Sequence, residues 1–314
     1  MYNSLMKKPV FIILGPTCTG KTSLALQLCR KFNGSILSAD SRQIVKYMDI
    51  GTGKVPLESG LSVEKNDGCW KVDGINIRGY DLIDPDKYYS GYDFLIYARE
   101  ILNMFKVGNI FIAGGTGFYI DLVTNRAVTA HVGLDPDLRK QLENLTLEEL
   151  CRELKRLNKE KFQLIDRKNK NRLVRAIEIE SARKTGVITG KKSVGNEFKY
   201  KYIGLTTSRE NLYSTADNWI DNIWEELLLE INKLKQMGFY NSLRLNGLVY
   251  KSAKVFLEGL VKEGEAKQRA KFDLHAYIRR QQTWFKRNSK IEWFDIESSN
   301  YRQKVEDFVE LNCG

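Results

Sequence analysis

The segment Gly15-Pro16-Thr17-Cys18-Thr19-Gly20-Lys21-Thr22 decides how this sequence is to be interpreted. It fits the pattern G-x-x-x-x-G-K-[ST], in which glycines let backbone N–H groups turn toward an anion and the lysine supplies a positive charge. The apolar residues 10–14 predict a buried strand before it, and the apolar stripe in residues 22–32 predicts a helix whose N-terminus faces the anion. The sequence therefore predicts a phosphate loop (residues 15–22) that binds a di- or triphosphate, with the Thr22 hydroxyl available to bind Mg²⁺.

Strand and helix patterns alternate in the first 124 residues. Short apolar runs at 35–38 and 109–113 predict two further buried strands, and the S-x-x-D pattern at Ser90 begins a predicted helix between them. Strands that are separated by helices pair in parallel. We therefore expect an α/β fold with a parallel sheet core of the P-loop NTPase type.

Helical patterns replace strand patterns after Leu122. Helices are predicted to begin at Asp135-Pro136, Thr146-x-x-Glu149 and Asn169. A strand pattern returns at 200–205, and long helices are predicted over 217–237 and 262–287. We expect residues 1–124 to form the first part of the core, 125–198 a helical insertion domain, and 199–314 the completion of the core with C-terminal helices.

The composition excludes several classes of protein. The chain has 314 residues, 42% of them hydrophobic, so it can bury a large core. No apolar run reaches the roughly 18 residues that a membrane span requires. The five cysteines form no C-x-x-C pair, which argues against disulfides and structural zinc and predicts a cytoplasmic protein. With only two histidines, H-E-x-x-H metal sites and histidine-based triads are not expected.

Positive charge is concentrated in two segments. Residues 166–201 carry eleven basic and four acidic side chains, and residues 265–290 carry eight basic and two acidic ones, in a chain of net charge +11. Such a distribution is typical of a protein that binds a polyanion, although two solvated helix faces would give the same pattern. The second segment interleaves aromatic residues that favour stacking on nucleic acid bases: Phe272, Tyr277, Trp284 and Phe285.

An acidic residue follows the second predicted strand. Residues 38–43 read Ser-Ala-Asp-Ser-Arg-Gln, and reactive groups of open parallel sheets gather beyond the carboxyl ends of the strands. Asp40 should therefore lie beside the phosphate loop, where it can accept a proton from a nucleophile. Arg42 and Gln43 are residue types that contact bases or phosphates. The alternative is a turn aspartate that caps the next segment.

The features of nucleotide hydrolases are missing. Such enzymes hold magnesium with a second carboxylate at the end of an apolar strand. The predicted strand at 109–113 is instead followed by Gly114-Gly115-Thr116, and no N-K-x-D motif for guanine exists. Ordinary ATP or GTP hydrolysis is therefore disfavoured.

Taken together, the motifs resemble those of the tRNA dimethylallyltransferases, also called tRNA isopentenyltransferases. The shared segments are GPTCTGKT at 15–22, SADSRQ at 38–43, MDIGTGK at 48–54, GGTGFYI at 114–120, NRLVRAIE at 171–178 and RQQTWF at 280–285. The resemblance implies transfer of a dimethylallyl group from dimethylallyl diphosphate to the N6 amine of the adenosine 3′ of the anticodon in tRNA. We expect a monomer that uses Mg²⁺ and binds the anticodon stem-loop through its insertion domain.

The resemblance also implies roles for individual residues. Asp40 accepts the proton of the amine, Thr17 contacts the bridging region of the diphosphate, and Lys21 with the loop amides stabilises the leaving diphosphate. Arg209 joins the phosphate loop in binding the donor. The residues expected to contact tRNA are Asp40, Ser41, Arg42, Gln43, Thr116, Lys168, Asn169, Lys170, Asn171, Arg172, Arg280 and Gln281.

The sequence departs from the family pattern at three arginines. In R-x-x-L-Y-x-R-I-x-x-R only Arg209 is kept, and Thr215 and Trp219 stand at the other two positions. His275 replaces the arginine of T-R-x-Y-A-K-R-Q. These changes bear on catalytic rate and on the donor that is used. Three alternatives stay open: an adenylate isopentenyltransferase that acts on free nucleotide, a P-loop kinase of a small molecule, and a non-catalytic tRNA-binding relative.

Overall fold

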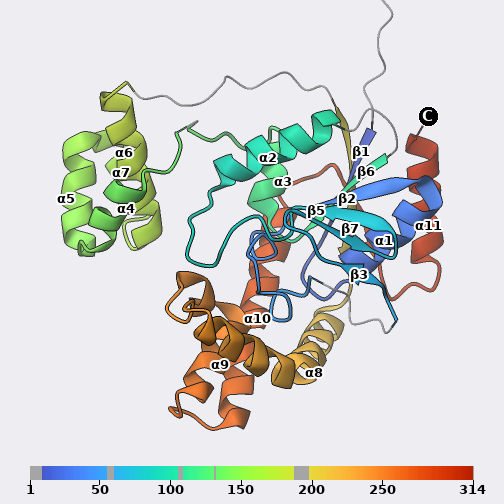
Figure 1. Ribbon diagram of the computed structural model, residues 1–314. Coiled ribbons are helices and arrows are strands. Elements are labelled where there is room, and N and C mark those ends of the chain that lie inside the picture. The colour runs from blue at the N-terminus through green and yellow to red at the C-terminus, as the bar shows by residue number, and fades with distance from the viewer. Residues whose placement is uncertain (1–8, 55–59, 105–108, 131, 187–197, 314) are drawn as a thin grey trace, which may run out of the picture.

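A computed structural model describes residues 9–54, 60–104, 109–130, 132–186 and 198–313. The core is an eight-stranded sheet in the order β3-β4-β5-β2-β6-β1-β7-β8 (Figure 1). Its strands are β1 (Pro9–Leu14), β2 (Gly34–Ser38), β3 (Val63–Glu64), β4 (Cys69–Val72), β5 (Ile75–Arg78), β6 (Asn109–Gly114), β7 (Lys199–Thr206) and β8 (Ile291–Asp295). The strands from β5 to β8 in this order pair in parallel, which confirms the predicted α/β fold with a parallel sheet.

The sheet has two edges that the sequence patterns did not predict. At one edge, β3, β4 and β5 pair antiparallel, and at the other β8 pairs with β7. These strands are short and have no two consecutive buried residues, as in β5, where Ile77 is buried and Asn76 is exposed. Their apolar runs are therefore too brief to be recognised as buried strands.

Helices cover both faces of the sheet. Side chains of β1 alternate between the faces, so that Phe11 and Ile13 join one apolar cluster and Val10 and Ile12 another. The first cluster is completed by α1 (Lys21–Phe32) and α11 (Tyr301–Asn312), and the second by α2 (Gly91–Met104) and α3 (Gly117–Val123). This layering buries the sheet and leaves its carboxyl-end edge open for a functional site.

Four helices between α3 and β7 form a separate group, on the left in Figure 1. They are α4 (Pro136–Glu143), α5 (Leu147–Leu157), α6 (Lys159–Leu164) and α7 (Lys170–Lys184). Their leucines and isoleucines form an apolar cluster drawn entirely from residues 138–177. The predicted helix starts at Asp135, Thr146 and Asn169 are confirmed, since each of these side chains accepts a backbone N–H at the start of its helix.

The C-terminal part adds a second helical group below the sheet in Figure 1. It consists of α8 (Arg209–Gln236), the 3₁₀ helix η1 (Leu243–Asn246), α9 (Leu248–Leu257) and α10 (Glu263–Phe285). The predicted start of α8 at 217 is wrong by eight residues, because Ser208 caps the helix and Leu212 and Ala216 extend its buried stripe. Among the described residues, no helix is long and apolar enough to cross a membrane.

Candidate active site

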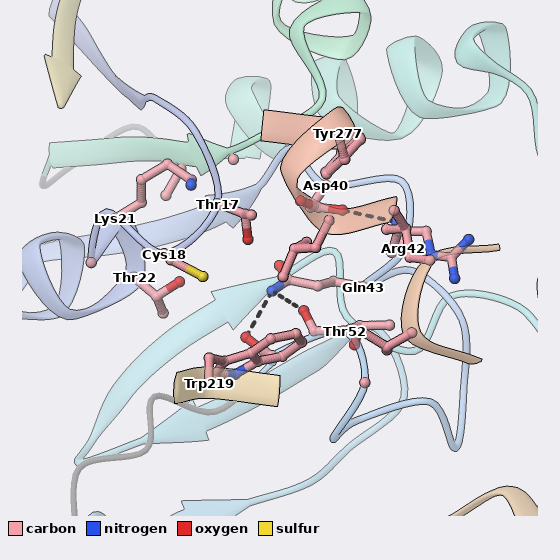
Figure 2. A pocket seen from close by; sticks show the side chains of 18 of the residues that line it. Thr17, Cys18, Lys21, Thr22, Asp40, Arg42, Gln43, Thr52, Trp219 and Tyr277 are labelled. Carbon is pink, nitrogen blue, oxygen red and sulfur yellow. Dashed lines mark hydrogen bonds between the residues drawn. The ribbon is translucent and has the colours of Figure 1, made fainter. Parts of the chain in front are cut away.

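The site lies where three parallel strands end. Strand β6 is placed between β1 and β2, so the phosphate loop after β1 and the Asp40 segment after β2 flank the end of β6. They enclose a cavity of about 510 Å³, which we call the central cavity (Figure 2). It is lined by Thr17, Cys18, Gly20, Lys21, Thr22, Ser23, Asp40, Arg42, Gln43, Gly51, Thr52, Gly53, Ala113, Gly114, Thr215, Trp219, Leu248, Val249, Leu274 and Tyr277.

The phosphate loop presents an anion-binding surface to this cavity. Gly20 precedes α1 with φ +74°, a left-handed conformation that suits glycine, and no side chain caps the first N–H groups of the helix. The Lys21 ammonium donates to the Pro16 carbonyl at 2.6 Å. Burial lowers the pKa of Lys21 to about 8, although nearby Asp40 acts in the opposite direction.

Some of the other residues of the phosphate loop line the central cavity, and the rest fix the shape of the loop. Cys18 lines the cavity, and burial raises the pKa of its thiol to about 11, so the thiol stays protonated. Thr19 is buried and its hydroxyl donates to the Pro16 carbonyl at 2.9 Å, which fixes the turn. Gly15 lies against the Leu205 carbonyl at the end of β7, where a Cβ would be only 2.5 Å away. Five of the eight predicted residues therefore face the cavity, and three shape the loop.

Asp40 is held at the cavity by bonds between two strand ends. Ala39 N–H donates to the Ala113 carbonyl and Thr116 N–H donates to the Ala39 carbonyl, at 2.8 and 3.2 Å. Ser41 N–H donates to the Thr116 hydroxyl at 2.9 Å. The Asp40 Oδ1 atom accepts from Arg42 N–H at 3.0 Å. The structure thus places Asp40 opposite the phosphate loop, and Thr116 beside Ser41 rather than in the cavity lining.

Gln43 makes three side-chain hydrogen bonds within the protein. Its side-chain amide donates to the Thr52 and Gly53 carbonyls at 3.3 and 3.0 Å and accepts from the Ser38 hydroxyl at 2.8 Å. These bonds use the groups with which it would read a base. Gln43 thus supports the cavity wall that Thr52 and Gly53 form (Figure 2). Because Gln43 also lines the cavity, its contact with the base stays a prediction.

A second support of this wall, Glu230, was not predicted from the sequence. Its carboxylate accepts N–H groups from Asp49 and Ile50 at 2.6 and 2.8 Å and the Tyr250 hydroxyl at 2.6 Å. Burial raises the pKa of Glu230 despite these bonds. The sequence contained one signal for this role: Glu230 stands next to Ile231, within the apolar stripe of α8.

The donor side of the cavity lacks the expected arginine. Arg209 is the first residue of α8, is exposed, and is not among the residues that line the cavity, so its contact with the donor stays a prediction. Thr215 and Trp219, further along α8, do line it. Of the described lining residues, only Lys21 and Arg42 carry positive charge. His275 lies outside the lining, where it is hydrogen-bonded to Asp217 at 2.8 Å.

A larger groove of about 840 Å³ lies next to the cavity. It is lined by segments of the core, the insertion helices and the C-terminal helices, and Arg42 lines both hollows. Tyr88 carries the Arg139 guanidinium 5.2 Å from its ring centroid. Further lining residues that suit a nucleic acid are Tyr89, Tyr92, Phe118, Asn171, Arg175 and Arg244. Of the predicted insertion residues 168–172, only Asn171 reaches the groove.

The basic segments carry less free charge than the sequence suggested. Arg175 pairs with Glu178 and Arg183 with Glu180 on α7, at 2.9 and 2.8 Å. On α10, Arg269 and Lys271 also pair with acids. Part of the first segment, residues 187–197, lies outside the described residues. The exposed cations of the predicted tRNA contacts are Lys168, Lys170, Arg172 and Arg280.

The aromatic residues of α10 mostly anchor the helix. Phe285 is buried in the core, and Trp284 donates its ring N–H to Asp121 at 2.9 Å, so neither is placed to stack on a base. Gln281 is also buried, with both ends of its amide bonded within the protein, which contradicts its predicted contact with tRNA. Tyr277 lines the central cavity and Phe272 is exposed.

Comparisons with known proteins identify the family to which this chain is similar. Residues 43–288 match the sequence model of the family described as IPP transferase, and residues 8–66 match that of isopentenyl transferase. The chain is 34% identical to the tRNA dimethylallyltransferase of Acetivibrio thermocellus over 94% of each chain, and 32% identical to that of Carboxydothermus hydrogenoformans over 97% of each. The full-length tRNA isopentenylpyrophosphate transferase of Bacillus halodurans is similar in structure, with a TM-score of 0.68 at 27% identity, covering 98% of this chain and 97% of that one. The chain therefore belongs to the IPP transferase family.

Proposed function

We propose that this enzyme transfers a dimethylallyl group from dimethylallyl diphosphate to the N6 amine of the adenosine 3′ of the anticodon in tRNA, and releases diphosphate. The observation that carries the proposal is that one cavity brings together a phosphate loop and a carboxylate, Asp40. Relatives at 32–34% identity over nearly the whole chain are tRNA dimethylallyltransferases, so the free-nucleotide and kinase alternatives are not favoured.

The phosphate loop serves the donor. Its N–H groups and the N-terminus of α1 bind the diphosphate, with Thr17 near its bridging region and Lys21 beside it. In the reaction the bond between the donor carbon and the diphosphate oxygen breaks while the N6–carbon bond forms. Negative charge then grows on the diphosphate, and Lys21 with the loop amides stabilises it most strongly at this stage.

Asp40 serves the acceptor. It lies across the cavity from the phosphate loop, where it can take the proton that the adenine amine loses on alkylation. A base within a folded loop must leave its stack to reach such a cavity. Arg42 lines both hollows and so marks the passage from the groove into the cavity.

The groove and the exposed cations bind the RNA. Aromatic rings and arginines in the groove suit unstacked bases and phosphates of an anticodon loop. Ser41 and Thr116 join at the rim near Asp40, and Arg280 lies on the exposed side of α10. On the insertion, Lys168, Lys170 and Arg172 are placed to follow the stem backbone, with Asn169 capping their helix.

Mg²⁺ fits the oxygen donors that the cavity offers. Among the described residues, no group of three or more His, Cys, Asp or Glu could hold a metal ion. Mg²⁺, however, needs only one or two protein oxygens when phosphate oxygens and water complete its shell. Thr22 lines the cavity beside Lys21 and would hold the ion, which would neutralise charge on the diphosphate. We also propose that the enzyme acts as a cytoplasmic monomer.

A direct experiment tests the proposal. Purified protein is incubated with labelled dimethylallyl diphosphate and either an anticodon stem-loop or AMP, and nucleosides are analysed by mass spectrometry. We expect dimethylallyl-adenosine in the stem-loop only. Transfer to AMP would favour the free-nucleotide enzyme, phosphorylation of a metabolite by ATP would favour the kinase, and tRNA binding without transfer would favour the non-catalytic relative.

A further inference from the structure

Gln281 connects two loops of the active site that are far apart in the sequence. It lies on α10, is only 4% exposed, and its amide oxygen accepts the Thr17 N–H at 2.9 Å. Its amide nitrogen donates to the Gly115 carbonyl at 3.0 Å. One side chain thus bonds the phosphate loop at one end and the loop after β6 at the other.

The two loops carry opposite sides of the reaction. Thr17 belongs to the loop that binds the donor. Gly115 borders the acceptor side, since a Cβ at this position would lie 3.4 Å from the Asp40 Oδ2 atom and 2.3 Å from the Gln281 amide nitrogen. The absence of a side chain at Gly115 lets Gln281 approach the backbone and leaves room beside Asp40.

Helix α10 presents this amide from a fixed position. One turn later, Trp284 is hydrogen-bonded to Asp121 of α3 and Phe285 is buried in the core. One turn earlier, Tyr277 lines the central cavity. The helix is therefore anchored to the same segment, residues 114–121, that Gln281 bonds.

We propose that Gln281 is a positioning residue that sets the separation between the donor-binding loop and the Asp40 side of the cavity. This inference rests on the proposed function. A primary amide suits the position because it accepts and donates at once, which neither a carboxylate nor an apolar side chain of the same length does. Gln281 itself does not line the cavity and so acts through Thr17 and Gly115.

Three substitutions distinguish the pair of hydrogen bonds from Gln281 to Thr17 and Gly115, which we call the bridge, from simple packing of the side chain. Gln281→Met keeps the length and removes both hydrogen bonds. Gln281→Glu keeps the acceptor for Thr17 N–H, but its ionised form cannot donate to Gly115. Burial next to a carbonyl raises the pKa of such a carboxyl, and its protonated form can make both bonds. Gln282→Ala, at the next and half-buried position, is the matched control.

The kinetic test compares kcat and KM on an anticodon stem-loop. Gln281→Met should lower kcat about 10- to 100-fold, because small misplacement of reacting groups is costly, and should change the donor KM less than about threefold. Gln281→Glu should recover activity relative to wild type as the pH falls. The ratio to wild type is the readout because three other ionisable side chains, those of Asp40, Lys21 and Tyr277, line the adjoining cavity. Gln282→Ala should match wild type.

Two results would overturn the inference. One is a wild-type kcat in Gln281→Met; the other is a Gln281→Glu enzyme whose activity relative to wild type does not change with pH. A measurement that needs no reaction keeps this separate from the proposed function: hydrogen exchange at Thr17 N–H. Exchange should be faster in Gln281→Met than in wild type and in Gln282→Ala. Equal exchange rates would show that Gln281 does not hold the Thr17 N–H. If wild-type protein transferred no prenyl group, the proposed function would fail while this test still decided on the bridge.

Discussion

The central cavity and the groove are adjacent but are built in opposite ways. The cavity is formed by strand ends and by side chains with fixed partners, such as Gln43 with three hydrogen bonds and Lys21 with the Pro16 carbonyl. The groove is lined from three parts of the chain and includes half-exposed Tyr88 and Phe118. The difference indicates that chemistry depends on single groups in the cavity, whereas RNA binding is spread over many contacts outside it.

The largest effect is expected from the acid of the cavity. Asp40→Asn keeps the shape of the side chain but removes the proton acceptor, so turnover should fall about 100- to 10,000-fold. Diphosphate affinity, measured by calorimetry, should change little. The matched control Asp307→Asn, at an exposed position of α11, should behave as wild type. Wild-type turnover in Asp40→Asn would show that Asp40 is not the proton acceptor. It would also contradict the view that the chemistry depends on single groups of the central cavity.

The next effect concerns the cation of the phosphate loop. Lys21→Ala should lower turnover about 100- to 1,000-fold and weaken diphosphate binding, because charge grows on the leaving group. Since the pKa of Lys21 is lowered to about 8, the lysine loses its proton as the pH rises through that value, and diphosphate affinity of the wild type should weaken there. The variant should lack this pH dependence. Unlabelled diphosphate should compete with the donor and ATP only poorly; tight binding and hydrolysis of ATP would contradict the assignment.

A smaller and cumulative effect is expected outside the cavity. Neutralising Lys168, Lys170 and Arg172 together should reduce the magnitude of the salt slope of stem-loop binding, by about 0.7 to 0.9 for each RNA phosphate that the variant no longer neutralises. Affinity for dimethylallyl diphosphate should not change, since these side chains do not line the cavity.

Filter binding at several salt concentrations measures this slope. A control that neutralises Lys71, Arg302 and Lys304, which line neither hollow, should leave the slope at its wild-type value. An unchanged slope in this triple variant would mean that the three cations form a solvated face, and that RNA lies along residues 279–287, at and beyond the C-terminal end of α10.

The smallest effect tests whether the insertion is energetically separate. Thr146 and Glu149 form a capping box at the start of α5. Thr146→Ala should cost about 0.5–2 kcal/mol of helix stability. Because the apolar cluster of the insertion draws only on its own residues, we expect faster hydrogen exchange within α4–α7 and unchanged exchange in the sheet. Equal loss of protection in both would show that the two parts unfold together.

The local parts of the molecule could be predicted from the sequence. The phosphate loop, the strand before it and the helix after it follow from residues that are neighbours in the chain, and so do the caps Asp135, Thr146 and Asn169. Asp40 could also be placed, because the carboxyl ends of parallel strands share one edge of a sheet. The division of the chain at 124 and 198 stays a prediction.

What the sequence determined by itself is the chemistry of the phosphate loop and the presence of Asp40 after a parallel strand. The tertiary structure decided which polar side chains meet. Gln281 is bonded to Thr17, 264 positions away in the sequence. Gln43 is bonded to the backbone of Thr52 and Gly53, and Arg209 is exposed. The physical reason is that a helix or a turn is selected by interactions between near neighbours, whereas the partner of a buried amide or guanidinium is fixed only when distant elements pack and leave it one arrangement that satisfies its hydrogen bonds.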